Sequence, residues 1–159
     1  MGKPKEGMAS SGEQMHYSVG AVIERKRDGK FLFVDRMKPP FGLACPAGHL
    51  DEGGESAEEA CAREVREEVG LGVKVLELIF EEEAAHNQCS RGVDTHYWRV
   101  YRCELDDEDA LPTRNLSEVR AVYWLSSDEI REKAREGKLE AIWIFWFRKM
   151  GIVNSPWKK

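Results

Sequence analysis

The chain has 159 residues, of which 33% are charged and 42% are hydrophobic, and its formal net charge is −5. This size and composition are typical of one soluble globular domain that can bury a proper core. The net negative charge argues against non-specific binding to nucleic acid, and no apolar run is long enough to span a membrane.

Cysteine usage indicates a reducing environment. The four cysteines, at positions 45, 61, 89 and 103, form no Cys-x-x-Cys pair. The sequence also shows no secretory signal with a cleavage site. We therefore expect a cytoplasmic location.

The beginning of the chain predicts a tail followed by two strands. Residues 1–14 contain almost no large apolar residue, which predicts a flexible N-terminal tail. Residues 17–23 and 31–34 are rich in strand-forming side chains. Asp28-Gly29 lies between these two runs and is a strong signal for a β-hairpin.

The middle of the chain predicts a helix with marked ends. Ser56 and Glu59 fit a capping box in which Ser56 is the N-cap, and Gly70 stands where a left-handed residue would end the helix. One apolar stripe repeats every four residues and can face a core; it consists of Cys61, Val65 and Val69.

The opposite side of this helix carries three glutamates on consecutive turns, Glu64, Glu67 and Glu68. Like charges at this spacing destabilise an isolated helix, so the face is either open to water or binds something positive. Most acidic helix faces are solvated surface. The order of the residues around these glutamates favours a site instead.

The rest of the chain predicts further strands and two more helices. We expect strands at residues 73–81, 96–105 and 119–125, and helices starting near 126 and covering 140–150. The first two of these strands should pair, and Ser127 is one possible cap of the first helix. The whole order predicts an α/β fold with a mixed sheet and a helix on each face. We expect a single domain over residues 15–151 and a C-terminal tail over 152–159.

The segment from Glu55 to Leu71 resembles the Nudix hydrolase signature, Gly-x5-Glu-x7-Arg-Glu-U-x-Glu-Glu-x-Gly-U, in which U is aliphatic. Every fixed position from Glu55 to Leu71 is present. One departure precedes it, because six residues rather than five separate Gly48 from Glu55, and the extra residue falls in a polar loop. The resemblance implies the α/β/α sandwich of this family, with a mixed central sheet.

The resemblance also implies roles for single residues. The expected metal ligands are Glu64, Glu67, Glu68 and, through its backbone carbonyl, Ala47. The residues expected to support the site are Gly48, Glu55 and Arg63. Glu64 can in addition act as the base for the attacking water. Mg²⁺ is the implied cation, with Mn²⁺ as a substitute, since both prefer oxygen ligands.

Members of this family often use one more carboxylate from a distant loop, as a ligand or as the base. Glu118 is our candidate, because the strand that follows it should anchor its backbone while its side chain reaches the site. The alternative is an ordinary exposed loop glutamate. The competing carboxylates are Glu81, Glu82 and Glu83.

Two other groups of side chains could form sites. A zinc site could be built from His86, Cys89, His96 and Cys103, but these spacings match no standard closed motif and we do not predict zinc there. A base-stacking surface could be built from Trp143, Phe145, Trp146 and Phe147, although aromatic residues at helical spacing more often form a core or a dimer contact. Phe41 and Tyr17 are alternative stacking residues.

The function implied by the resemblance is metal-dependent hydrolysis of the diphosphate linkage in a nucleoside diphosphate joined to another moiety. A nucleoside triphosphate or an ADP-ribose-like molecule would be such a substrate. One alternative is a catalytically idle module for ligand sensing or protein binding, but such modules typically lose signature glutamates. Another is a prenyl-diphosphate isomerase, whose active-site cysteine context is not clearly reproduced by Cys45 or Cys61. The partners that this interpretation allows are a nucleotide-like small-molecule substrate and a second copy of the chain, in a homodimer.

Overall fold

The computed structural model describes residues 3–51, 53–85, 93 and 95–153. Its elements, in chain order, are β1 (Glu6–Met8), β2 (Gln14–Ile23), β3 (Phe31–Arg36), β4 (Leu43–Ala44), β5 (Ala47–His49), α1 (Ala57–Val69), β6 (Val73–Ala84), β7 (Thr95–Leu105), β8 (Val119–Leu125), α2 (Ser127–Arg135) and α3 (Ala141–Lys149). Among the helices of these residues, none is both apolar enough and long enough to cross a membrane.

The strands form two sheets. The larger sheet has the order β1-β2-β7-β6, with β5 also paired to β2, and the smaller has the order β4-β3-β8. The pairing of β2 with β7 is parallel, from Met15 opposite Thr95 to Ile23 opposite Cys103, whereas β6 pairs with β7 antiparallel. The expected mixed sheet is therefore confirmed, and a second, antiparallel sheet stands beside it.

The predicted β-hairpin of β2 and β3 is wrong. The chain does turn at Asp28-Gly29, where Gly29 has a φ of 68° and its N–H donates to the carbonyl of Arg25. Beyond one bridge between Glu24 and Phe31, however, the two strands belong to different sheets. The reason is that β7 pairs with one edge of β2, while β1 and β5 pair along the other.

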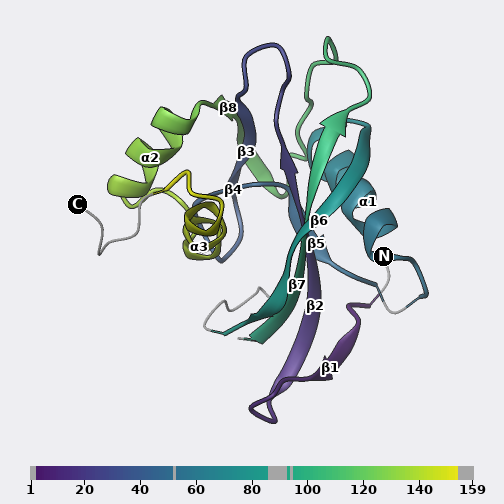
Figure 1. Cartoon of the computed structure of the whole chain (residues 1–159). Helices are drawn as coiled ribbons and strands as arrows, with labels where there is room; N and C mark the ends of the chain where they lie inside the picture. The colour runs from purple at the N-terminus through teal and green to yellow at the C-terminus, as the bar shows by residue number, and fades with distance from the viewer. Residues whose placement is uncertain (1–2, 52, 86–92, 94, 154–159) are drawn as a thin grey trace.

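Helices cover both faces of the strands, with α1 on one side and α2 and α3 on the other (Figure 1). The core beneath α1 consists of residues such as Val19, Ala21, Ile23, Leu32 and Val34, packed on Cys61, Val65 and Val69. The core on the other side is built on Trp143, Trp146 and Phe147 of α3, all 0% exposed. These tryptophans and this phenylalanine are thus core residues, as the alternative interpretation of the aromatic cluster held.

The ends of α1 follow the sequence signals. The Ser56 hydroxyl accepts the N–H of Glu59 at 3.1 Å, and the Ser56 N–H donates to the Glu59 carboxylate at 2.9 Å. Gly70 ends the helix with a φ of 68°. The cap of α2 is Ser126 rather than Ser127, because only Ser126 has a glutamate, Glu129, three residues later to complete a capping box.

The ordered structure extends beyond residues 15–151. Within the predicted N-terminal tail, β1 pairs antiparallel with β2, and the Lys5 N–H donates to the carbonyl of Leu50. These are backbone contacts, which a composition poor in apolar side chains does not exclude. Val153 is buried against the core on the α3 side, and residues 154–159 of the predicted C-terminal tail lie outside the described residues.

We expect Ser56→Ala to lower the free energy of unfolding by about 1 kcal/mol, because α1 would lose its N-cap hydrogen bond. Urea denaturation followed by circular dichroism measures this change. Ser10→Ala, at an exposed turn, is the matched control and should leave the midpoint unchanged. Equal midpoints for the two variants would contradict the stabilising role of the capping box.

Candidate active site

A cavity of about 250 Å³ lies beside α1 and β5. Among the residues that line it are Ala47, Gly48, Arg63, Glu64, Glu68 and Glu118, all of which the sequence singled out. Three separate segments supply them: β5, the acidic side of α1, and the loop before β8. The remaining two candidates of the signature, Glu55 and Glu67, contact Arg63.

Arg63 connects the glutamates of the signature to one another. Its guanidinium donates to Glu55 at 2.8 Å, to Glu64 at 2.8 Å and to Glu67 at 3.0 Å, and also to the carbonyl of His49 at 3.1 Å. The hydrogen bonds with Glu55 are the main reason that the pKa of Arg63 is raised. The same contact lowers the pKa of Glu55. Arg63 thus ties α1 to the loop before it and to the end of β5.

Glu64 lies directly against β5. Its side chain is 15% exposed, and burial raises its pKa to about 7, an effect that Arg63 opposes and that Glu67 and Glu118 increase. A Cβ atom on Gly48 would lie 2.1 Å from the Glu64 carboxyl carbon. Only glycine at position 48 therefore lets this carboxylate reach the cavity in the observed position.

Glu68 is the most deeply buried carboxylate of the site, with 6% exposure. Burial raises its pKa well above the usual range, and the charges of Glu64 and Glu118 add to this. Arg36 and a hydrogen bond with the backbone of Ala47 act in the opposite direction. Burial and the two neighbouring carboxylates thus both disfavour the ionised form of Glu68.

Glu118 lies at the cavity because its loop is bound to the end of α1. The N–H of Asn115 donates to the carbonyl of Glu68 at 3.0 Å, and the N–H of Glu118 donates to the carbonyl of Asn115 at 3.0 Å. The Glu118 carbonyl in turn accepts the N–H of Met37 at 3.0 Å, just beyond β3. Both sides of this residue are therefore held by backbone hydrogen bonds while its side chain lines the cavity.

The competing glutamates of β6 have other partners. Glu81 binds Arg99 at 2.9 Å, Glu82 pairs with Lys149, and Glu83 accepts the N–H of Ser10 at 2.8 Å. Among the described residues, the lining of the cavity includes Glu118 but none of these three. Proximity to Glu64 and Glu68 therefore favours Glu118.

The donor set at this cavity fits a hard divalent cation. Glu64, Glu68 and Glu118 offer carboxylate oxygens, and Ala47 lies beside them. Mg²⁺ and Mn²⁺ prefer such oxygen ligands, and a bound cation would relieve the repulsion among the buried carboxylates. Glu67 is more exposed, at 38%, and its carboxylate is bound by Arg63.

Sequence reasoning missed further basic and acidic residues that line the cavity. Arg36 at the end of β3 lies 3.6 Å from the Glu140 carboxylate, and Lys38 follows nearby. Burial raises the pKa of Glu140 to about 7, against the effect of Arg36. Local sequence carries no signal for this pair, because it depends on the contact of the start of α3 with β4 through the N–H of Glu140 and the carbonyl of Leu43.

Among the described residues, the members of the possible zinc set and the alternative stacking residues lie apart. His96 lines the cavity, whereas Cys103 is buried in the core beneath α1, 3.8 Å from the sulfur of Cys61, so the two cannot share one metal ion. The remaining members of that set, His86 and Cys89, lie outside the described residues. Phe41 is 62% exposed beside a second cavity, and Tyr17 packs against the core beneath α1.

Comparison with known proteins shows similarity to one family over most of the chain. Residues 14–147 match the family model of the NUDIX domain. The chain is 34% identical over 136 residues to a MutT-like protein of Streptomyces ambofaciens, covering 86% of this chain and 79% of that protein. It is also 34% identical over 115 residues to the CTP pyrophosphohydrolase of Escherichia coli K12, covering 70% and 76%.

Solved structures extend the similarity to three dimensions. A NUDIX hydrolase from Nitrosomonas europaea aligns with a TM-score of 0.61 and 30% identity, over 77% of this chain and 78% of that one. The matches to the family model and to the relatives cover most of the chain, and the fold agrees with them. The chain belongs to the Nudix hydrolase family.

Proposed function

We propose that the chain is a metal-dependent pyrophosphohydrolase that cleaves the diphosphate linkage of a nucleoside diphosphate joined to another moiety. The observation that carries this proposal is the convergence of Glu64, Glu68 and Glu118 on one cavity that also contains Arg36 and Lys38. The carboxylates suit a divalent cation, and the two cationic side chains suit the phosphate oxygens of a substrate. The name of the Escherichia coli relative, a CTP pyrophosphohydrolase, supports the same chemistry.

Mg²⁺ is the proposed cofactor, with Mn²⁺ as a substitute. Glu64, Glu68 and the carbonyl of Ala47 would hold the ion, with Glu118 or Glu67 as further ligands. A divalent cation supplies neutralisation of the phosphate charge and polarisation of the phosphorus–oxygen bonds.

The protein's own groups would carry out the remaining work of hydrolysis. A water oxygen attacks one phosphorus atom, its proton passes to the carboxylate of Glu64 or Glu118, and the bond from that phosphorus to the bridging oxygen breaks. The electron pair of that bond leaves with the departing phosphate group. Arg63 holds Glu64 in place through its hydrogen bond at 2.8 Å and acts as a positioning residue.

The second candidate function is an idle Nudix module that binds a ligand without turning it over. The presence of every signature glutamate argues against it. A panel of (d)NTPs and ADP-ribose, assayed for release of phosphate or pyrophosphate with and without Mg²⁺, tests both. Turnover that requires the cation supports the enzyme, whereas binding without turnover supports the module. Hydrolysis in ¹⁸O-water, read by mass spectrometry, shows which phosphorus is attacked.

A cytoplasmic location and a homodimer stay predictions for this protein. So does binding of a nucleotide-like small molecule rather than non-specific nucleic acid, which follows from the net charge of −5.

We expect Glu68→Gln to weaken the binding of Mg²⁺ and Mn²⁺ without lowering the stability of the ion-free protein. Glutamine keeps the size of the side chain and removes a buried charge that its neighbours disfavour. Thermal unfolding with and without Mg²⁺ measures both effects, since a ligand that binds only the folded state raises Tm. Glu77→Gln, on the exposed side of β6, is the control. Equal Mg²⁺-induced shifts in both variants would remove Glu68 from the metal site.

We expect Glu64→Gln to lower turnover by about 100-fold or more, because it removes a charge needed to bind metal or to take a proton. Folding should be nearly intact, as the glutamine fits against Gly48 in the same way. Steady-state kinetics with the best substrate of the panel gives the measurement. Arg66→Gln, an exposed substitution on the same helix, should keep the wild-type rate. If Glu64→Gln turns over as fast as Arg66→Gln, Glu64 has no part in the chemistry.

We expect Glu118→Gln to lower turnover by about 10- to 1000-fold and to shift the acid limb of the pH–rate profile, because a carboxylate near Glu64 and Glu68 is lost. Glu81→Gln, which removes a competing carboxylate paired with Arg99, should change neither quantity. The assignment fails if the wild-type rate and profile persist in Glu118→Gln, and a loss in Glu81→Gln would move the base to β6.

A further inference from the structure

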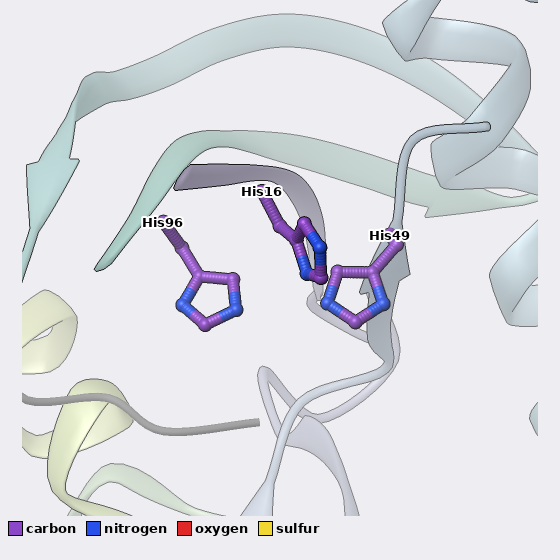
Figure 2. Close-up of side chains that lie close together, drawn as sticks. All are labelled: His16, His49 and His96. Atoms are coloured by element: carbon purple, nitrogen blue, oxygen red, sulfur yellow. The ribbon is translucent and has the colours of Figure 1, made fainter. Parts of the chain in front are cut away.

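Three histidines meet on the face of the larger sheet that lies opposite α1. His16 comes from β2, His49 from β5 and His96 from β7, and their rings are turned toward one another (Figure 2). Each ring offers one nitrogen, and these three atoms all lie within 4.8 Å of one another. The Nudix signature assigns no role to any of these three histidines.

The strand register brings these side chains together. His16 and His96 stand opposite each other in the parallel pair of β2 and β7, and His49 stands opposite Ser18 in the pair of β2 and β5. Since side chains two residues apart share one face of a strand, His16 and Ser18 point the same way. Three adjacent strands thus place their imidazoles on one face, where the ring centroids are 4.9 to 6.0 Å apart.

The cluster is buried in an environment that suits a metal ion. His16 is 2% exposed and His96 is 1% exposed, so both rings are almost completely shielded from solvent. Imidazole nitrogen is the commonest protein ligand for divalent transition metals and is a poor ligand for Mg²⁺. The donor type therefore differs from that of the carboxylate cluster on the same cavity.

We propose that His16, His49 and His96 form a binding site for one divalent transition-metal ion, of which Zn²⁺ is the representative. Bonds of about 2.0–2.1 Å to zinc would bring the three nitrogens to roughly 3.3 Å from one another, a contraction that small ring rotations supply. The Glu6 carboxylate lies 3.8 Å from Nε2 of His16, so a negative charge stands beside the cluster.

The site would be open on one side. His49 and His96 both line the cavity that also contains Glu64, Glu68 and Glu118. Three histidines with a free fourth position are typical of zinc sites that exchange a water or an anion, in contrast to closed structural sites. A zinc ion here would therefore present its fourth position to an anionic oxygen of a molecule in the cavity. The inference does not depend on the proposed hydrolysis.

Zinc binding by the full chain, purified without a metal-affinity tag and stripped with a chelator, tests the proposal. Equilibrium dialysis against Zn²⁺ is carried out with Mg²⁺ in large excess to occupy the carboxylates, and the metal content is measured by elemental analysis. We expect one Zn²⁺ per chain, and at least about a 10-fold weaker affinity in His49→Gln and in His96→Gln. Glu77→Gln, on the exposed side of β6, is the control and should bind zinc like the wild type.

Two further measurements make the outcome unambiguous. Far-ultraviolet circular dichroism reports whether each variant is folded, and His49, the least buried of the three, is the substitution that the fold tolerates best. Co²⁺ in place of Zn²⁺ distinguishes nitrogen from sulfur ligands, because thiolate ligands add a charge-transfer band in the near ultraviolet. No zinc uptake by the wild type, wild-type affinity in folded His49→Gln, or a thiolate band would each overturn the proposal.

Discussion

The structure depends on one constraint, the concentration of carboxylates on a single side of α1. Arg63 partly balances this charge, and it does so by binding Glu55, Glu64 and Glu67 at once. Since the same guanidinium also holds the carbonyl of His49, electrostatic balance and the position of β5 are set together. Among the described contacts, Arg63 makes no hydrogen bond or ion pair with Glu68 or Glu118. The charge that remains is the reason for proposing a cation site in this cavity.

The surrounding fold keeps these carboxylates close together and partly buried from solvent. α1 is fixed at both ends by its caps and along one side by the core beneath it. The loop before β8 is tied to the C-terminal end of α1 by backbone hydrogen bonds, which brings Glu118 to the same cavity. Contacts outside the charged cluster thus hold the carboxylates together against their mutual repulsion. The unfavourable interactions at the proposed site are thus offset by favourable ones in the rest of the fold.

Sequence reasoning succeeded where the signal is local. The capping box of Ser56, the Gly70 terminus and the stripe of Cys61 depend on spacing within one helix, and all three are found. It failed for the β2–β3 hairpin, because a turn signal at Asp28-Gly29 does not tell which edges of β2 other strands will occupy. The meeting of His16, His49 and His96, and that of Arg36 with Glu140, likewise depends on pairing between distant segments. No local pattern contains this information.

The parallel pairing of β2 with β7 has a consequence for how the protein reaches its native state. Met15 lies opposite Thr95, so this ladder closes a loop that contains most of the elements of the site. Loop closure of this length is an entropic barrier that must be crossed before the native contacts can compensate for it, and such topologies fold slowly. The cavity is therefore incomplete until β7 has joined β2, since His96 and Trp98 of β7 form part of its lining. Nascent chains that still lack β7 would carry the whole acidic helix and yet offer no completed binding site.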